Sequence, residues 1–262
     1  MTALVLEAQL FFLVFARIIA LVQTAPLLSS EGVPFIAKTA LAFFAAVAVL
    51  PGVAASGYPI PDAAGLYVLL IVGEAMVGIV IGFFLTVVYS VFLVSGQFFS
   101  LQMGFGASQV FDPLAQVQIP LMGQFLNIVA MLVFISTGGL QRIFLSGVYG
   151  SFRAMRAVDL ALHREDIVWM VAGALSRLFE QALVISFPVL GTLMLISVTM
   201  GLLAKAAPQM NLLMLGFPIA ITVAFILLFV GMPLIMAAFV RVIDEGFLAI
   251  EFFLSQLFGG GG

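Results

Sequence analysis

Apolar residues fill six long stretches of the chain, separated by polar or helix-breaking residues. By sequence, these stretches are 3–28, 35–55, 66–103, 121–147, 167–204 and 212–243, followed by a shorter amphipathic piece at 245–258. The intervals contain stop signals such as Pro51-Gly52 and the residues Pro208 to Asn211. About 20 helical residues cross a bilayer core. The pattern therefore predicts an all-α integral membrane protein.

The stretch 66–103 is too long for one simple crossing. A continuous helix of that length would measure about 57 Å, whereas the hydrocarbon core is about 30 Å thick. Tilt absorbs only part of such a difference. We expect the stretch either to fold back as a hairpin or to be buried along its length against other protein. The stretch 167–204 has the same problem, although Pro188 and Gly191 offer a place to bend.

The charges of the loops and the number of apolar stretches disagree on which side of the membrane the loops lie. The loop from Arg142 to Arg164 carries four arginines and should face the cytoplasm by the positive-inside rule. The loop from Gly52 to Gly65 has no Lys or Arg and should face the other side. Alternate crossings join these two loops only if 66–103 crosses twice or the loop at Gly104 re-enters the membrane. A conventional six-span topology therefore fits poorly, and we treat the chain as one structural unit.

Composition supports the membrane assignment and excludes several functions. The 262 residues are 64% hydrophobic and 8% charged, with a mean hydropathy of +1.31; soluble domains are about a quarter charged. The absence of cysteine excludes disulfides and thiolate metal sites, and a net charge of -3 without a basic run predicts no nucleic-acid partner. The only histidine, His163, is expected in a solvated loop. We find no catalytic, metal-ligand or phosphate-binding motif and expect neither enzymatic activity nor a cofactor.

Five of the charged residues within the apolar stretches are candidates for function, because an ionisable group at membrane depth is costly and by default suggests function. They are Glu7, Arg17, Glu74, Arg177 and Glu180. Arg177 and Glu180 are three residues apart and can pair on one helix. Glu7 and Arg17 are too far apart for that, so each needs a partner elsewhere or a water-lined surface. For Glu74 we favour pairing with a neighbouring helix or chain over a role in transport.

The sequence GEAMVGIVIGFF predicts a helix surface made of small residues. Gly78 and Gly82 form a GxxxG pair, and Gly73 extends the same surface. Such spacing lets two helices approach closely and gain packing contacts that lipid does not supply. The motif does not decide between packing within this chain and packing against another subunit.

Residues 104–122 form an irregular, apolar stretch. Gly104, Gly106, Asp112-Pro113 and Pro120 oppose a regular helix. The stretch has too little charge for a solvated linker, and irregular backbone at membrane depth is tolerated only when protein encloses it or it lines a watery cavity. From the residues alone, a structural loop packed on the protein is favoured over a plug in a pore.

Several motifs, in order along the chain, resemble the FliR/SctT family of bacterial type III export-gate proteins. The resemblance covers about residues 5–245 and rests on the runs GEAMVGIVIGFF, SGQFFSLQMGFGASQVFDP, QIPLMGQFLNIVAMLVFISTGGL and GLLAKAAPQMNLLMLGFPIAI. The triplet Phe111-Asp112-Pro113 favours the flagellar branch over the injectisome branch.

The resemblance implies a fold and a set of partners. One copy of such a chain joins FliP and FliQ homologues in a helical pore, with FlhB and FlhA as further partners. The pore lies in the inner membrane at the flagellar basal body and is partly raised above the membrane plane. A FliP-like hairpin part at about 1–165 would be fused to a FliQ-like hairpin part at about 166–258, with a flexible tail at 259–262. Sister subunits as well as lipid would then enclose the long helices.

The resemblance also implies that loop 104–122 lies in the central channel, where it helps to close the path of unfolded export substrates. We hypothesise that its glycines act as hinges, its phenylalanines as stoppers and its glutamines as contacts for passing chains. The predicted plug residues are Gly104, Phe105, Gly106, Gln109, Phe111, Asp112, Pro113, Gln116, Gln118 and Met122.

Other functions remain as alternatives. An injectisome homologue would share the fold and differ in cargo. A small-solute secondary transporter would use Glu74 or Arg177 for binding, with helices broken at Gly104 and Pro188. Such carriers usually show related halves, and this sequence has no evident internal repeat. An intramembrane enzyme would need a set of catalytic groups that the sequence lacks.

Overall fold

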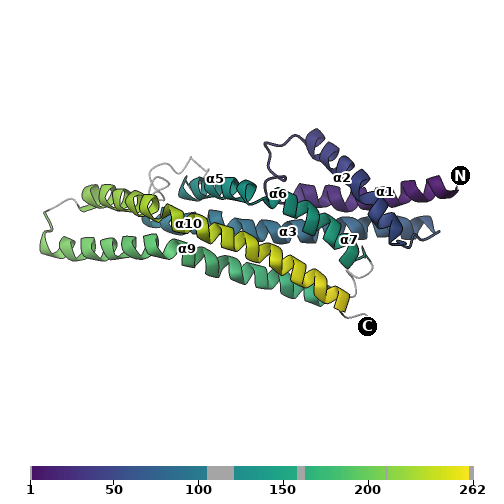
Figure 1. Ribbon diagram of the computed structural model, residues 1–262. Coiled ribbons are helices and arrows are strands. Elements are labelled where there is room, and N and C mark those ends of the chain that lie inside the picture. The colour runs from purple at the N-terminus through teal and green to yellow at the C-terminus, as the bar shows by residue number, and fades with distance from the viewer. Residues whose placement is uncertain (1, 105–120, 158–162, 210–211, 260–262) are drawn as a thin grey trace. The chain divides into compact units, whose positions relative to one another are not determined.

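The computed structural model describes residues 2–104, 121–157, 163–209 and 212–259 (Figure 1). All the regular elements within these ranges are helical. They are α1 (Thr2–Thr24), α2 (Phe35–Ala55), α3 (Ala64–Gln102), α5 (Leu121–Ser136), α6 (Gly139–Arg142), the π-helix η2 (Ile143–Gly150), α7 (Ser151–Ala154), α9 (Arg164–Ala206) and α10 (Leu212–Gly259). The apolar stretches of the sequence have become the long helices, so the all-α prediction is confirmed.

Five helices of the described chain are long and apolar enough to cross a membrane: α1, α2, α3, α9 and α10. The interrupted pair made of α5 and Gly139–Ala154 brings the number to as many as six. The composition of the helices therefore agrees with an integral membrane protein.

Helix α3 is one continuous helix of 39 residues, which excludes the hairpin alternative for this stretch. Half of its most apolar 18-residue window is buried within the chain, whereas the corresponding figure is 17% for α9 and for α10. Protein therefore encloses much of α3, as its excessive length required. Helices α9 and α10, at 43 and 48 residues, leave most of their apolar surface uncovered by this chain.

The predicted basic loop from Arg142 to Arg164 is mostly helical, which corrects the sequence interpretation. The chain breaks after α5 at Gly138, whose φ of 71° lies in the left-handed region that suits glycine. Helical structure then continues through α6, η2 and α7 to Ala154. The apolar stretch 121–147 is thus interrupted in its middle, and its second part extends into the residues that were expected to form the loop.

One further boundary differs from the sequence interpretation. The amphipathic piece 245–258 is not separate, because α10 runs through it without interruption. Helix α9 contains Pro188, where the sequence offered a place to bend, and is assigned as one helix through it. Thr192 Oγ1 donates a hydrogen bond of 2.8 Å to the Pro188 carbonyl, one turn earlier on the same helix.

The chain divides into two compact units built from discontinuous segments. Unit 1 comprises Met1–Val88, Gly138–Leu175 and Ile243–Gly262, and unit 2 comprises Tyr89–Thr137 and Ser176–Val242. The long helices α3, α9 and α10 each contribute one segment to either unit. The predicted division into parts at 1–165 and 166–258 remains a prediction. Of the predicted tail, residues 260–262 lie outside the described residues.

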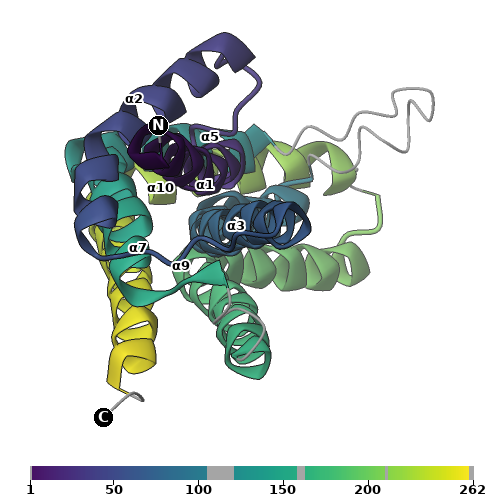
Figure 2. The same cartoon turned by 90° about the vertical axis from the view of Figure 1, so that its right-hand side faces the viewer.

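In unit 1, α1 lies along α3 (Figure 2). The buried side chains of α1 recur every three or four residues and so share one face of the helix; they are Leu10, Leu13, Val14, Arg17, Ile18, Leu21 and Val22. The π-helix η2 completes this core, because Gly147 faces Leu21 of α1 and Ile81 of α3. Helix α2 packs on α1 with the rings of Phe43 and Phe11 at 5.4 Å.

The core of unit 2 is built around aromatic rings. Phe92 and Phe239 are both fully buried, with ring centroids 4.2 Å apart. The ring of Tyr89 lies edge-on to Phe92, and its hydroxyl donates a hydrogen bond of 3.1 Å to the Asn127 carbonyl. These contacts fix α3 to α5 and α10 within this unit.

Candidate functional site

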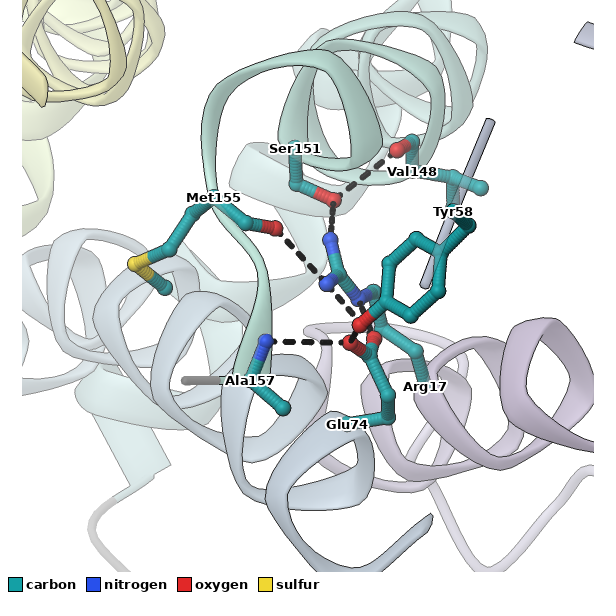
Figure 3. A network of polar contacts seen from close by, with 7 residues as sticks. All are labelled: Arg17, Tyr58, Glu74, Val148, Ser151, Met155 and Ala157. Carbon is teal, nitrogen blue, oxygen red and sulfur yellow. Dashed lines mark hydrogen bonds and ion pairs between the residues drawn. The ribbon is translucent and has the colours of Figure 1, made fainter. Parts of the chain in front are cut away.

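The most buried polar cluster of the described chain is centred on Arg17 of α1 and Glu74 of α3 (Figure 3). Both side chains are fully buried, and Arg17 Nη2 lies 2.5 Å from Glu74 Oε2. Arg17 Nε donates a second hydrogen bond of 2.5 Å to the same oxygen. The sequence predicted that each charge needs a partner outside its own helix. The structure supplies each with the other, 57 positions apart in the chain.

Three further polar groups complete the cluster around the guanidinium. Arg17 Nη1 donates to Ser151 Oγ at 3.1 Å, and Arg17 Nη2 donates to the Met155 carbonyl at 2.8 Å. Ser151 Oγ in turn donates to the Val148 carbonyl. The guanidinium carbon lies 3.9 Å from the centre of the Phe152 ring, close enough for a cation–π contact. Arg17 therefore fixes α7 and the residue that follows it to α1.

The second oxygen of Glu74 binds two connecting segments. Glu74 Oε1 accepts a hydrogen bond from the Tyr58 hydroxyl, in the connection between α2 and α3, and one of 3.1 Å from the Ala157 backbone N–H. Burial raises the pKa of the Tyr58 phenol, and the negative charge of Glu74 raises it further. The phenol therefore stays protonated at neutral pH and can donate to the carboxylate.

The position of these contacts overturns one prediction of topology. The loop from Gly52 to Gly65 and the basic segment that ends at Arg164 were expected on opposite sides of the membrane. In unit 1, however, Tyr58 and Ala157 bind the same carboxylate oxygen, so these two connections meet (Figure 3). The prediction failed because the residues from Arg142 to Ala154 were interpreted as part of a loop. Once this part is helical, it brings Ala157 to the connection that contains Tyr58.

The cluster is suited to holding segments together. Across the described residues, every buried side-chain nitrogen or oxygen has a hydrogen-bond partner. A buried charge pair of this kind is stable only when geometry and additional hydrogen bonds offset the cost of desolvation. In the same part of the chain, no group of three or more His, Asp or Glu side chains is arranged to hold a metal ion.

The three predicted packing glycines face residues of unit 1. A Cβ on Gly78 would overlap the Arg17 carbonyl oxygen, and one on Gly82 would overlap the Thr24 side chain. A Cβ on Gly73 would lie 2.8 Å from that of Ala157. The GxxxG pair thus brings α3 against α1 at the level of the Arg17–Glu74 pair, and the contact that the motif predicts is made within the chain.

The remaining predicted buried charges are exposed on this chain. Glu7, Arg177 and Glu180 all lie at its surface. The expected ion pair between Arg177 and Glu180 is not among those that the described residues form. A spacing of three residues permits such a pair, but exposed side chains gain little from it and lose rotamer freedom.

Most of the predicted plug lies outside the described residues, namely Phe105, Gly106, Gln109, Phe111, Asp112, Pro113, Gln116 and Gln118. The two ends of the loop are described and belong to unit 2. Gly104 has a φ of 87°, and a Cβ at this position would overlap the ring of Phe217. Met103 and Met122, which flank the loop, are both buried. Gln102 Nε2 donates a hydrogen bond of 2.9 Å to Ser197 Oγ on α9.

Sequence reasoning missed three polar contacts in unit 1. Lys38 of α2 is buried, and its Nζ donates a hydrogen bond of 3.0 Å to the Ser29 carbonyl. Arg142 pairs with Asp244, and Ser146 donates a hydrogen bond to Glu251, so η2 and its N-terminal flank are tied to α10. The spacing of Asp244 and Glu251, seven residues apart on one helix face, was a signal that could have indicated this contact.

Comparison with known proteins identifies the family. The model of "Bacterial export proteins, family 1" matches residues 8–246, which include most of both units. The chain belongs to this bacterial export protein family. Within the family, it is similar to the Flagellar biosynthetic protein FliR of Bacillus subtilis (strain 168), with 34% identity over 86% of either chain.

Two further relatives match from about 70% to 95% of their own length and of this chain. The Flagellar biosynthetic protein FliR of Borreliella burgdorferi is 31% identical over 72% of this chain and 70% of its own length. The protein of the same name from Escherichia coli (strain K12) is 27% identical over 95% of this chain and 94% of its own length. The family match over residues 8–246 contains the positions of Arg17 and Glu74.

Proposed function

We propose that this chain is a core subunit of the flagellar type III protein export gate. In this role it forms part of the wall of a channel through which unfolded flagellar subunits cross the bacterial inner membrane. The observation that carries the proposal is membership of the export protein family over residues 8–246, together with similarity to flagellar FliR proteins from three bacteria.

The exposed surfaces of the long helices support a place in a hetero-oligomer. Only 17% of the most apolar window of α9, and of that of α10, is buried within this chain. Both helices have about twice the residues that a bilayer core requires. Their surplus apolar length needs protein around it, because water would not solvate it and lipid does not reach it. We propose FliP and FliQ homologues as these neighbours, with one copy of this chain per pore and with FlhB and FlhA close by.

Loop 104–122 is the part of the chain that we propose closes the channel. Its residues are apolar and irregular by sequence, and its two ends start from buried positions, Met103 and Met122. The hinge assigned to Gly104 agrees with a backbone conformation that residues other than glycine rarely adopt. Closed and open states would then exchange, and a substrate or partner that binds the open state better would shift the population toward it.

Neither rival function has an observation in its favour. The solute-transporter alternative placed Glu74 in a binding site, but both of its oxygens bind groups of the same chain. The injectisome alternative shares the fold, yet the three relatives above are flagellar proteins. We therefore propose that the cargo consists of flagellar subunits.

The native mass of the detergent-extracted protein tests whether the chain works in a complex. Expressed together with FliP and FliQ homologues, the chain of 27.9 kDa should purify in one hetero-oligomer several times its own mass. The ratio of subunits, measured by native mass spectrometry, should give one copy of this chain per particle. A particle that contains only this chain, as a monomer or a small homo-oligomer, would support the transporter alternative instead.

A further inference from the structure

One face of α9 in unit 2 combines two charges with large apolar side chains. Arg177, Glu180, Val184 and Phe187 recur at intervals of three or four residues, so they lie along the same side of the helix. All four are exposed on this chain, with Val184 and Phe187 each 69% accessible. We refer to these four residues as the mixed face of α9.

The charges of the mixed face have no partner in the part of the chain that the structure describes. Arg177 and Glu180 form no ion pair with one another or with another residue there, and neither donates or accepts a side-chain hydrogen bond. In unit 1, by contrast, the charged pair Arg17–Glu74 is fully buried and satisfied within the chain.

Neither lipid nor water suits such a face. In hydrocarbon, unpaired charges such as those of Arg177 and Glu180 are strongly unfavourable. In water, the exposed side chains of Val184 and Phe187 would form an apolar patch together with Phe179 and Leu183, which flank them. A protein surface can satisfy both the charged and the apolar residues of the mixed face, because it can supply opposite charges and apolar packing at once.

We propose that the mixed face of α9 is the docking surface for one helix of a different membrane subunit. This helix presents a carboxylate to Arg177 and a lysine or arginine to Glu180, and small or apolar side chains to Val184 and Phe187. The proposal rests on the proposed function, which places one copy of the chain among other subunits. Charge complementarity specifies the partner: its basic and acidic groups lie about one helical turn apart, as Arg177 and Glu180 do.

Charge reversal tests the two ionic contacts. The variants are Arg177→Glu and Glu180→Lys in the chain co-expressed with the FliP and FliQ homologues. Each should lower the amount of co-purified subunits at least about tenfold, because the reversal leaves the partner's charge buried at the interface beside a like charge. Lys205→Glu is the matched control: it reverses one exposed charge on the same helix, outside the mixed face, and should leave the yield of the complex unchanged.

Cross-linking identifies the occupant of the face. The chain has no cysteine, so Val184→Cys introduces a single thiol, and a bifunctional reagent should join it to a helix of a co-expressed subunit. Mass spectrometry of the adduct then locates the facing carboxylate. Reversal of that carboxylate to lysine should restore the yield of the Arg177→Glu variant.

The outcomes separate this inference from the proposed function. If the unaltered chain forms the complex and both charge reversals also form it at full yield, the docking surface is wrong while the export-gate assignment stands. An adduct between two copies of this chain would overturn the proposal in favour of a homo-oligomer. If the unaltered chain and Lys205→Glu both fail to assemble with the other subunits, the proposed function itself fails.

Discussion

Replacing Glu74 with glutamine should destabilise unit 1 by about 3–5 kcal/mol, the cost of removing one partner of a buried ion pair. The substitution preserves the size of the side chain but leaves the guanidinium of Arg17 without a counter-charge at a fully buried position. It also weakens the hydrogen bonds from Tyr58 and Ala157, which would then reach a neutral amide oxygen. We expect most of the protein to be lost from the membrane fraction.

The measurement is the temperature at which half of the detergent-extracted protein aggregates, together with its steady-state level in membranes. Glu7→Gln is the matched control, because Glu7 lies on the apolar helix α1 but is exposed on this chain. It should leave the stability of the isolated chain nearly unchanged. Equal stability of the two variants would show that the Arg17–Glu74 pair does not hold unit 1 together.

Replacing Gly78 with alanine should also destabilise unit 1, although alanine favours helices more than glycine does by about 1 kcal/mol. A Cβ at Gly78 overlaps the Arg17 carbonyl oxygen and lies 3.0 Å from the Leu21 backbone nitrogen. Both atoms belong to the backbone of α1, so neither can move aside as the end of a side chain would. The two helices must separate, at a cost of about 1–3 kcal/mol from overpacking, and the contact between Arg17 and Glu74 should lengthen with them.

Gly65→Ala provides the control on the same helix. No atom lies within 4 Å of a Cβ at Gly65, which is exposed near the start of α3. This substitution should be neutral or slightly stabilising. Glycine-to-alanine replacement should therefore lower the stability of unit 1 at position 78 but not at position 65. If Gly78→Ala proves as stable as Gly65→Ala, the close approach of α1 and α3 is not a feature of the folded protein.

The sequence predicted the long helices well because their signal is local. Uninterrupted apolar runs such as that of α3 can satisfy their backbone groups at membrane depth only as helices. The predicted boundaries between helices and loops were wrong where local signals compete. The four arginines between Arg142 and Arg164 suggested a loop, but Arg142 pairs with Asp244, about a hundred positions away, and the helix persists to Ala154.

The sequence identified only some residues of the polar cluster. Arg17 and Glu74 stand out because a charge within an apolar stretch needs a partner, but their pairing depends on the packing of α1 against α3. Tyr58 and Ser151 carry no such signal, since tyrosine and serine are common in loops and helices of any kind. Local spacing is also an incomplete guide to ion pairs: Arg177 and Glu180 could pair on one helix but do not do so among the described residues.

The plug role of loop 104–122 was the prediction that had the least support from the residues alone. Composition and helix breakers identify loop 104–122 as irregular and apolar, but a channel between subunits is a property of the assembly and not of one chain. Only the resemblance to the export-gate family indicated that role. Met103 and Met122, at the two ends of the loop, are buried in unit 2, which is compatible with a plug and also with a packed structural loop.

Ion conductance across a bilayer tests whether loop 104–122 closes the channel of the assembled pore. The purified complex of this chain with its FliP and FliQ homologues would be reconstituted in two forms, one unaltered and one lacking residues Gln109 to Gln118. We expect the unaltered pore to be closed and the deletion variant, at the same native mass, to conduct ions continuously. A deletion variant that assembles fully and stays as impermeable as the unaltered complex would contradict this expectation.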